Sequence, residues 1–400
     1  MPQASSPLRI LILRQGFYPQ DPRVQREALA LTAAGHRVQV LCLRGPDQAA
    51  TETVEGVRVH RLALGRRRGG AGRYLLDYGA FFLAAFLWLA RRQPRERFQV
   101  VQVNTLPDAL VWAAWPARLG GAALVLDLHE VMPELYASRF SLAMNHPLPR
   151  LLGRLETAAI RFADRAVAVS EPCLEIYLAR GAPAARFAVV TNSPDPRRFP
   201  PRAPDPPPPG PRRIVSHGTL VARYGFDVLL EAFALLAGWT GYEDLRLELL
   251  GEGELRPLLQ ERARALGLEE RVSLPGELPL EAMAEHLAGA ALGVVANRDD
   301  PFTALVLPTK LMEYFILGIP AVASGTAAVL RQCPADWLRL AAPGDAEALA
   351  GVMAQALASP GESLAMARRA QEGFAAQLGW ERMAARYVAH VEGAALRADR

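Results

Sequence analysis

The sequence has little cysteine and little lysine. Its 400 residues include three cysteines, Cys42, Cys173 and Cys333, which lie far apart and form no Cys-x-x-Cys pair. This excludes a structural zinc site of that kind, and an odd, sparse count argues against a disulfide framework and fits a reducing compartment. Lysine is nearly absent while arginine is abundant, which is typical of GC-rich coding.

A secretory signal is also lacking. The N-terminal segment has only a short apolar run around residues 10–13, without a basic region before a longer apolar stretch, so we expect a cytoplasmic protein. The 45 Lys and Arg residues against 41 Asp and Glu give a net charge of +4, and no ladder of basic and aromatic residues is present. A balance this mild suits an anionic ligand or membrane surface and does not predict nucleic-acid binding.

Hydrophobic residues make up 51% of the chain, enough for large cores, and the length suits two to three domains. Short apolar runs that read as buried strands alternate with helical stretches, which predicts doubly wound α/β domains. The expected strands are 8–13, 38–43, 100–103, 123–126, 166–169, 214–217, 245–250, 272–274, 292–295 and 321–323. The clearest helices are 24–34 and 228–236, and residues 380–396 are apolar at helical spacing.

A proline-rich segment divides the chain. Eight of the twelve residues in 200–211 are proline, which predicts a stiff linker. We therefore predict an N-terminal domain over residues 1–200, a linker over 201–211 and a C-terminal domain over 212–380. Open α/β sheets bind ligands beyond the carboxyl ends of their strands, so two such domains facing a cleft would hold a donor and an acceptor.

The most specific segment is residues 307–324, where 308–310 begin a periodic helix that ends at Gly318. The free N–H groups of a helix start favour an anion, and Lys310 in the first turn opposes the helix dipole unless something negative lies there. Glu313 follows one turn on, on a similar face. Together they would hold a diphosphate and the hydroxyls of a sugar; the alternative is a Lys–Glu pair on the helix surface.

This segment, P-T-K-L-x-E-Y-x-x-x-G-I-P-x-V-A-S, resembles the donor-site signature of GT-B glycosyltransferases of family 4, the group 1 type. The resemblance extends over nearly the whole chain in the expected order. Its other motifs are Asp21-Pro22-Arg23-Val24, Asp127-Leu128-His129-Glu130, Asn192-Ser193-Pro194-Asp195, His217-Gly218-Thr219-Leu220 with Arg223-Tyr224-Gly225, Gly251-Glu252-Gly253, and Val272-Ser273-Leu274-Pro275-Gly276.

The resemblance implies a GT-B fold, in which two tandem Rossmann-like domains face a cleft and a C-terminal helix, residues 381–400, crosses back. It also implies a role for each motif residue. The catalytic candidates are His129, Arg223, Lys310 and Glu313. The donor-binding candidates are Gly16, Gly218, Thr219, Gly251, Gly253, Gly276, Thr309 and Glu313. The acceptor-side candidates are Asp21, Arg23, Asp127 and Glu130.

The resemblance further implies a retaining enzyme with no cofactor and no metal, in which Lys310 and Arg223 neutralise the leaving diphosphate. The nucleotide sugar is then a substrate. Two positions depart from the family. Leu305 stands where an earlier Glu that contacts the transferred sugar is usual, so that contact is either missing or supplied by Asp299, Asp300 or the backbone. Arg223 lies one residue before the position at which the family has its cation.

Several candidates have plainer alternatives. His129 can be a structural histidine, and Asp21 and Arg23 can be a helix cap and an exposed charge. Gly16 can serve only a turn with positive φ. The segment from Tyr74 to Arg92, apolar almost all round over 74–90 and flanked by arginines, is either a buried helix or a peripheral contact with the inner face of the cytoplasmic membrane.

These observations predict a hexosyltransferase that moves a sugar from a nucleotide-sugar donor to a hydroxyl of a glycan acceptor, either lipid-linked or a cell-surface precursor. One alternative is a degenerate GT-B subunit that binds a partner enzyme. Another is a GT-B nucleotide-sugar epimerase, which Leu305 disfavours because such chemistry needs several carboxylates. A dinucleotide-binding dehydrogenase is less suited, since no G-x-G-x-x-G follows the first strand.

Overall fold

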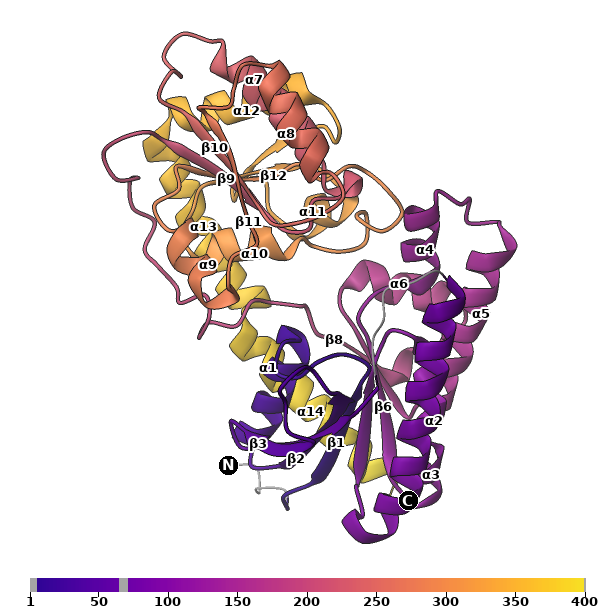
Figure 1. Cartoon of the computed structure of the whole chain (residues 1–400). Coiled ribbons are helices and arrows are strands. Elements are labelled where there is room, and N and C mark those ends of the chain that lie inside the picture. Colours follow the sequence, from indigo (N-terminus) through magenta and orange to yellow (C-terminus); the bar gives the residue numbers. More distant parts are fainter. Residues whose placement is uncertain (1–5, 65–70, 399–400) are drawn as a thin grey trace. The chain divides into compact units, whose positions relative to one another are not determined.

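The computed structural model describes residues 6–64 and 71–398, and the chain divides into two compact units (Figure 1). The first unit comprises Met1–Asn192 with Met383–Arg400, and the second comprises Ser193–Arg382. Each unit is built on one sheet with helices on both faces. The prediction of two Rossmann-like α/β domains is confirmed, and the last helix, α14 (Trp380–Ala398), returns to the first unit.

Among the described residues, the first sheet has the strand order β3-β4-β2-β1-β5-β6-β7-β8. Its strands are β1 (Arg9–Arg14), β2 (Arg37–Leu43), β3 (Thr51–Val54), β4 (Val57–Leu62), β5 (Val100–Asn104), β6 (Ala123–Leu128), β7 (Arg165–Ala168) and β8 (Phe187–Val189). Neighbouring strands pair in parallel except β3, which is antiparallel to β4. The sequence reading missed β3 and β4 because charged residues interrupt them, as suits strands at a solvated edge.

Helices cover both faces of the first sheet. They are α1 (Pro22–Ala33), α2 (Ala71–Glu96), η1 (Asp108–Ala114), α3 (Trp115–Leu119), α4 (Met132–Phe140), α5 (Pro147–Phe162), α6 (Glu171–Ala179) and η2 (Ala184–Arg186). The side chain of Gln102 on β5 bonds to Glu27 of α1 and to Tyr387 of α14, which places α1 and α14 on one face. Figure 1 shows α2, α3 and α5 on the other face.

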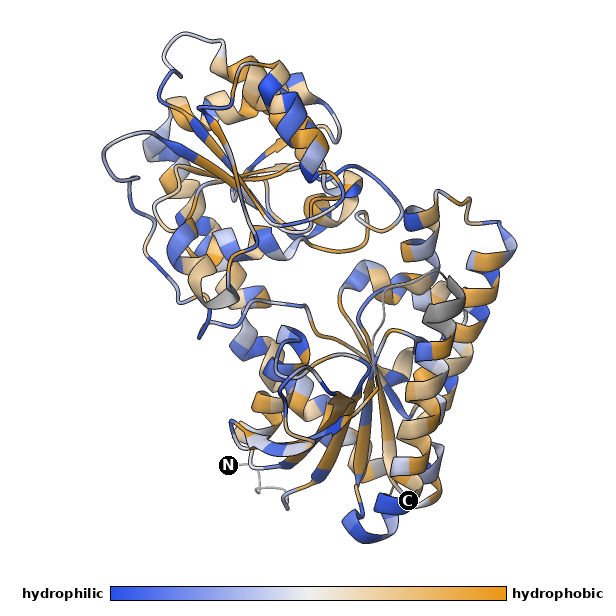
Figure 2. Ribbon diagram, in the orientation of Figure 1, coloured by the Kyte–Doolittle hydropathy of each residue, from blue (hydrophilic) through white to orange (hydrophobic). Residues whose placement is uncertain are grey.

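The long apolar stretch of the sequence lies within α2, a helix of 26 residues. One side of this helix is buried, with Phe81, Ala85 and Leu89 at 0% exposure. The opposite side carries three leucines that are 69%, 57% and 41% exposed, namely Leu76, Leu83 and Leu87. The alternative of a buried helix therefore does not hold for this side. Figure 2 shows apolar residues along α2. None of the helices in the described ranges combines the length and apolarity that crossing a bilayer requires.

The second sheet is parallel throughout, in the order β11-β10-β9-β12-β13-β14. Its strands are β9 (Arg213–His217), β10 (Arg246–Leu250), β11 (Val272–Gly276), β12 (Leu292–Val295), β13 (Ala321–Ser324) and β14 (Arg339–Ala341). Its helices are η3 (Ala222–Tyr224), α7 (Phe226–Ala237), α8 (Arg256–Ala265), α9 (Leu280–Leu287), α10 (Thr309–Ile316), α11 (Ala327–Gln332), α12 (Ala346–Ala358) and α13 (Pro360–Leu378).

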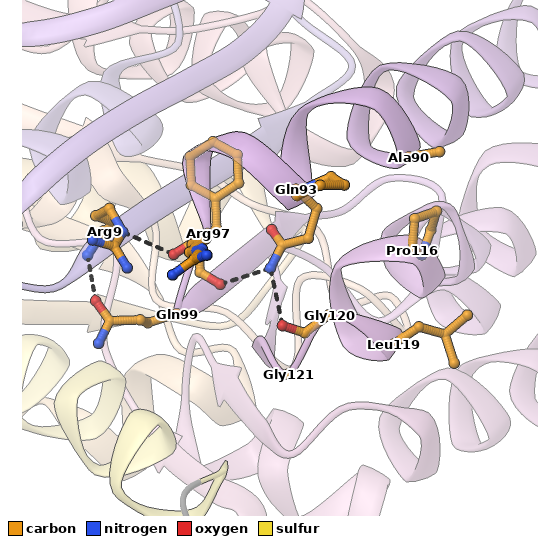
Figure 3. Close-up of a pocket in the computed structure, with 11 residues that line it drawn as sticks. Arg9, Ala90, Gln93, Arg97, Gln99, Pro116, Leu119, Gly120 and Gly121 are labelled. Carbon is orange, nitrogen blue, oxygen red and sulfur yellow. Dashed lines mark hydrogen bonds between the residues drawn. The ribbon is translucent and has the colours of Figure 1, made fainter.

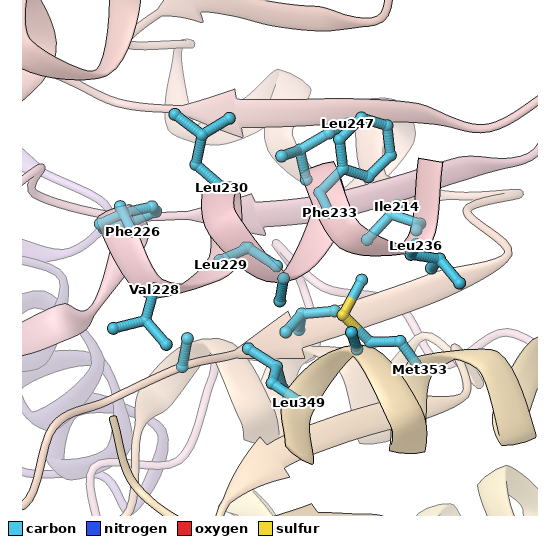
Figure 4. Packing of buried hydrophobic residues seen from close by; sticks show 14 of the residues in the cluster. Ile214, Phe226, Val228, Leu229, Leu230, Phe233, Leu236, Leu247, Leu349 and Met353 are labelled. Atoms are coloured by element: carbon cyan, nitrogen blue, oxygen red, sulfur yellow. The ribbon is translucent and has the colours of Figure 1, made fainter. Parts of the chain in front are cut away.

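Apolar clusters hold the helices on the two faces of this sheet. Figure 4 shows one of them, where α7 and α12 meet the sheet through Leu229, Phe233, Ile214, Leu349 and Met353. Burying a side chain of this size contributes about 1.5–3 kcal/mol each, which fixes α7 to the strands. The other cluster packs α10 and α13 against the opposite face and so fixes the start of α10 beside the carboxyl ends of the strands.

Candidate functional site

The second unit holds a buried cation without a counter-charge in contact. Lys310, in the first turn of α10, is 7% exposed, and its Nζ forms no hydrogen bond with any residue in the described ranges. It lies 4.6 Å from the centroid of the Phe226 ring and 5.3 Å from that of Tyr224. The alternative of a Lys–Glu pair on the helix surface is therefore wrong, since the ammonium group is buried against aromatic rings.

Burial changes the charge of this group. Burial lowers the pKa of Lys310 to about 7, although the nearby Glu313 carboxylate opposes the shift. The first N–H groups of α10 have no partners within the helix, and they add positive potential at the same place. An anion bound here would pair with the Lys310 ammonium group and raise its pKa, so that the amine stays protonated at neutral pH. An ammonium group beside free helix N–H groups is an arrangement that can hold an anion.

Glu313 lies one turn further along α10, beside a buried histidine. Its Oε2 is 2.6 Å from Nε2 of His217 at the end of β9, in a close contact that is not an aligned hydrogen bond. Burial and then the charge of Lys310 lower the pKa of His217 to about 3, so the imidazole is neutral. Burial raises the pKa of Glu313 to about 8 despite Lys310. A half-buried carboxyl of this kind can bond to hydroxyl groups in either protonation state.

Four glycines bring three loops together at the carboxyl ends of β9, β10 and β11. Gly218, Gly251 and Gly276 have positive φ values of 126°, 134° and 93°. A Cβ atom on Gly251 would lie 2.0 Å from the carbonyl oxygen of Gly218, and one on Gly253 would lie 2.4 Å from that of Leu220. The loops therefore pack backbone against backbone. Gly218 also borders the cation, because its own Cβ position lies 4.0 Å from Nζ of Lys310.

The three remaining candidates of this unit lie near the same loops. Arg223 in η3 is half-buried, with its guanidinium 5.6 Å from the Phe302 ring centroid and 5.9 Å from that of Tyr224. Tyr224 thus lies within reach of both cations, Arg223 and Lys310. Thr309 is exposed at the first position of α10 and Thr219 is exposed after Gly218, so both hydroxyls are open to a ligand.

The first unit holds a buried polar cluster at the carboxyl ends of β5 and β6. Arg23 of α1 is 6% exposed and forms salt bridges with Glu27, at 3.0 Å, and with Asp127. The idea that Arg23 is an exposed charge is therefore wrong. Burial and the Asp127 charge raise the pKa of Glu27 to about 7, and burial also raises that of Asp127, although Arg23 opposes both shifts.

His129 lies at the rim of this cluster. Its Nε2 is 3.0 Å from Oδ2 of Asp127 and 3.1 Å from Nδ2 of Asn104, and its backbone N–H donates to Thr105. Burial and then the charges of Arg23 and Arg14 hold the pKa of His129 well below its usual range. The tautomer sets the roles of the ring: a proton on Nε2 donates to Asp127 and leaves Nδ1 as an acceptor, whereas an unprotonated Nε2 accepts from the Asn104 amide and the proton then lies on Nδ1.

Asp21 is a helix cap, as one of the alternatives predicted. Its side chain accepts from the backbone N–H groups of Arg23 and Val24, and Arg14 donates to it from Nε at 2.9 Å. These partners lower its pKa against the effect of burial. Gly16 does not have positive φ, so the turn alternative for that residue is wrong. Glu130 follows His129 and is half-buried.

Family models match both units of the chain. A glycosyl transferase 4-like domain matches residues 20–193, and a domain of glycosyl transferases group 1 matches residues 211–359. The chain belongs to the group 1 glycosyltransferases. The prediction of a GT-B, family 4 type of chain is confirmed, as is the prediction that the protein is a sugar-transferring enzyme.

Solved structures share the fold of this glycosyltransferase. Sucrose-phosphate synthase from Thermosynechococcus elongatus has 19% identity and a TM-score of 0.77, over 98% of this chain and 100% of that one. HepE of Anabaena with UDP-glucose has 16% identity and a TM-score of 0.71, and WaaG, of lipopolysaccharide biosynthesis, has 15% and 0.70; each match covers 96% of this chain and 100% of the other.

A curated relative is similar over a shorter stretch. Mannosylfructose-phosphate synthase from Agrobacterium fabrum is 28% identical over 123 residues, which are 29% of this chain. The match thus spans about a quarter (24%) of that relative's length.

The position at which this glycosyltransferase departs from its family signature is Leu305, which is half-buried. Of the two nearby carboxylates, Asp300 is used within its own loop, where its Oδ1 accepts from the backbone N–H groups of Phe302 and Thr303 at 2.8 Å each. Asp299 is exposed. In the described ranges, no group of three or more His, Cys, Asp or Glu side chains is arranged to hold a metal ion.

Sequence reasoning missed five residues that build the two clusters. They are His217, Glu27, Gln102, Asn104 and Tyr387. A signal was present for some of them. Gln102 and Asn104 are polar residues at alternating positions of an otherwise apolar strand, so they share one face. Lys310, which the sequence did single out, carried a stronger signal. It is the only lysine among the 45 Lys and Arg residues of the chain.

Proposed function

We propose that the protein is a hexosyltransferase that moves a sugar from a nucleotide-sugar donor to a hydroxyl of a glycan precursor, with retention of configuration. The observation that carries the proposal is Lys310, a buried ammonium group at the start of a helix whose Nζ has no hydrogen-bond partner among the described residues. A diphosphate is the ligand whose charge and size suit this group together with the neighbouring N–H groups. The binding of UDP-glucose by the structurally similar HepE supports the same assignment.

Departure of a nucleoside diphosphate requires that its growing charge be neutralised. Lys310 supplies one cation from within the fold, and Arg223 supplies a second from η3, with Tyr224 within reach of both. Two cations held in this way would serve without a divalent metal. Glu313, beside the neutral His217, would accept hydrogen bonds from the sugar hydroxyls of the nucleotide.

The first unit would bind the acceptor. With its proton on Nε2, His129 offers a neutral ring nitrogen, Nδ1, as an acceptor, while Asp127 and Asn104 fix the ring from the other side. A neighbouring hydroxyl of the acceptor that donates to Nδ1 would orient the acceptor. The attacking hydroxyl keeps its own proton, which passes to the leaving phosphate as the new glycosidic bond forms. Lipid-linked precursors are the acceptor class we favour, because one side of α2 is apolar and exposed.

That side of α2 suits peripheral contact with an anionic membrane. The exposed Leu76, Leu83 and Leu87 run along the helix, and Arg91 and Arg95 follow them on the same side without burial. An apolar stripe that ends in arginines is typical of a helix that lies in the headgroup region. The match in fold to WaaG, a glycosyltransferase involved in lipopolysaccharide biosynthesis, supports such an acceptor.

The test begins with binding. Nucleoside diphosphates are titrated against the full chain by calorimetry, and the Lys310→Met and Glu313→Gln variants are compared with Arg262→Met as a control, because Arg262 only pairs with Glu231 at an exposed surface. We expect binding by the parent and the control, and a loss of roughly 10²–10³ in transfer rate for Lys310→Met. Unchanged transfer in Lys310→Met would overturn the proposal. Absence of all nucleotide binding would favour a partner-binding subunit.

A further inference from the structure

A cavity of about 530 Å³ lies at the amino ends of the strands in the first unit, at the opposite edge of the sheet from His129 (Figure 3). The start of β1, the last turns of α2, the segment 97–99 and the end of α3 line it. Because β1, β5 and β6 run in parallel, this edge cannot share a ligand with the carboxyl edge. The cavity is a feature that sugar transfer does not use.

One end of the cavity is cationic. Arg9 donates from Nε to the backbone oxygen of Arg97 at 2.8 Å, and its backbone N–H donates to Gln99 at 3.1 Å. This fixes the Arg9 side chain and leaves its two terminal nitrogens for a ligand. Arg97 is exposed and forms no ion pair within the described ranges. No aspartate or glutamate is among the lining residues that the structure describes.

The end of α2 lies here too, and the carbonyl groups at a helix C-terminus would repel an anion. Several carbonyl oxygens around this point already accept hydrogen bonds from nearby donors. The backbone N–H of Arg97 donates to the oxygen of Gln93 at 2.9 Å, and the Gln93 side chain donates to the oxygens of Phe98, at 3.0 Å, and Gly120, at 3.4 Å. The guanidinium groups therefore dominate the potential at this end.

The other end of the cavity is apolar. Its lining residues are Ala90 and Pro94 of α2 with Pro116 and Leu119 of α3, and Leu119 is 77% exposed. Ala90 also lies three residues beyond Leu87, at the end of the exposed leucine stripe of α2. The cavity is thus amphiphilic, and its apolar end continues into the side of α2 that we assign to membrane contact.

We propose that this cavity binds the phosphate headgroup of an anionic phospholipid, with the phosphate on Arg9 and Arg97 and the glycerol and first methylene groups on Pro94, Pro116 and Leu119. The inference rests on the proposed membrane contact of α2 and specifies its partner. It gives the contact a lipid preference, because two guanidinium groups with no lining carboxylate favour a net negative headgroup over a zwitterionic one.

The full chain is mixed with vesicles of phosphatidylcholine alone or with 30% phosphatidylglycerol (about one lipid in three), and vesicle-bound protein is measured by flotation. Arg9→Gln/Arg97→Gln is compared with Arg44→Gln/Arg58→Gln, which removes the same charge from exposed positions of the same unit. We expect the cavity variant to lose roughly 10-fold or more in binding to the anionic vesicles, and the control to lose less than about 3-fold. Equal losses would overturn the inference.

Two further measurements separate binding through the cavity from binding through the leucine stripe, and a lipid headgroup from a free phosphate ester. Leu83→Ser/Leu87→Ser tests the stripe itself and is expected to weaken binding to both kinds of vesicle. If the parent binds both vesicles equally and only this variant loses binding, the headgroup inference fails while membrane contact stands. If the parent binds neither, both fail. Glycerol 3-phosphate is added as a competitor; if millimolar amounts release the protein, a free phosphate ester is the occupant and the lipid assignment is overturned.

Discussion

The hydroxyl of Tyr387, on the last helix of the chain, donates a hydrogen bond of 2.5 Å to Oε1 of Gln102 in the middle of the first sheet. The amide of Gln102 in turn donates to Glu27 at 2.8 Å and to Asn104 at 3.1 Å, and Asn104 donates to Asp127 at 2.6 Å. Residues 285 positions apart are thus joined in one buried network that reaches His129. The return of α14 to the first unit supplies part of the support for the acceptor-side residues.

We expect Tyr387→Phe to lower the free energy of unfolding by about 1–3 kcal/mol, because it leaves Oε1 of Gln102 buried without a donor. Tyr177→Phe is the matched control. Tyr177 is also fully buried, but its hydroxyl has no hydrogen-bond partner among the described residues, so its removal is expected to cost less than about 0.5 kcal/mol. Urea denaturation of both variants measures the difference, and equal losses would show that the hydroxyl bond contributes nothing.

The proton of Lys310 is expected to accompany nucleotide binding. Since the pKa of Lys310 is lowered to about 7 in the free protein, a bound diphosphate must raise it, and affinity then falls as the pH increases above 7, by at most about 10-fold per unit. Below that pH the ammonium group is already charged and affinity levels off. The titration is directly measurable by reductive methylation with ¹³C-formaldehyde. This reaction labels amines, and Lys310 is the single lysine of the chain, so the N-terminal amino group gives the only other signal.

A lysine resonance that titrates near pH 10 in the free protein would contradict this picture. So would a nucleotide affinity that is constant from pH 7 to pH 9, since both results would mean that the ammonium group is charged before the ligand arrives. Calorimetry in two buffers of different ionisation enthalpy gives an independent count of the protons taken up on binding.

Much of the fold follows from the sequence, and the reasons are local. The apolar runs at 10–13 and 292–295 can only be buried strands, and the prolines at 200–211 exclude regular structure. The donor-side motif was recognisable because its residues are consecutive, so that Lys310 and Glu313 share a helix face by spacing alone. The residues that they contact, His217 for Glu313 and the ring of Phe226 for Lys310, come from other segments.

The acceptor-side cluster shows the opposite situation. The sequence left Arg23 open between an exposed charge and an acceptor-side residue, because its partner Asp127 is 104 residues away. The burial of both groups depends on how α1 packs on the sheet, which sequence spacing does not specify. The exposure of one side of α2 was likewise unpredictable, since a helix that is apolar all round gives no sign of which side the sheet covers.

Arg23 is expected to be required for folding because it neutralises two buried carboxyl groups. Arg23→Met leaves Glu27 and Asp127 unpaired and should cost about 3–5 kcal/mol near neutral pH. Adding Glu27→Gln removes one of these charges and should restore part of the loss, since the pKa of Glu27 is already raised to about 7. Thermal unfolding of the single and double variants measures the coupling, and a double variant less stable than Arg23→Met would exclude this account.

A second buried group of carboxyls, outside the sugar-transfer machinery, sets the response to alkaline pH. Asp108 at the start of η1 is 2% exposed, and neither of its oxygens has a hydrogen-bond partner among the described residues. Glu156 of α5 is fully buried beside it and is bonded to Arg180, at 2.8 Å, which also binds Glu134, at 2.5 Å. Three acids therefore share one cation. Burial, reinforced by Glu156, raises the pKa of Asp108 well above its usual value, and burial raises that of Glu156 to about 7.

Because both acids bind protons more tightly in the folded chain than in the unfolded one, stability is greatest below about pH 4 for this pair and declines as the pH rises through 7. Asp108→Asn removes one buried titrating group. We expect it to match the parent at pH 4 and to exceed it at pH 8 by on the order of 1–3 kcal/mol. Asp205→Asn, at an exposed position, is the control and should follow the parent at both pH values. Denaturation curves at pH 4 and pH 8 measure this difference. If Asp108→Asn loses as much stability between the two pH values as the parent does, Asp108 is ionised in the folded chain at both.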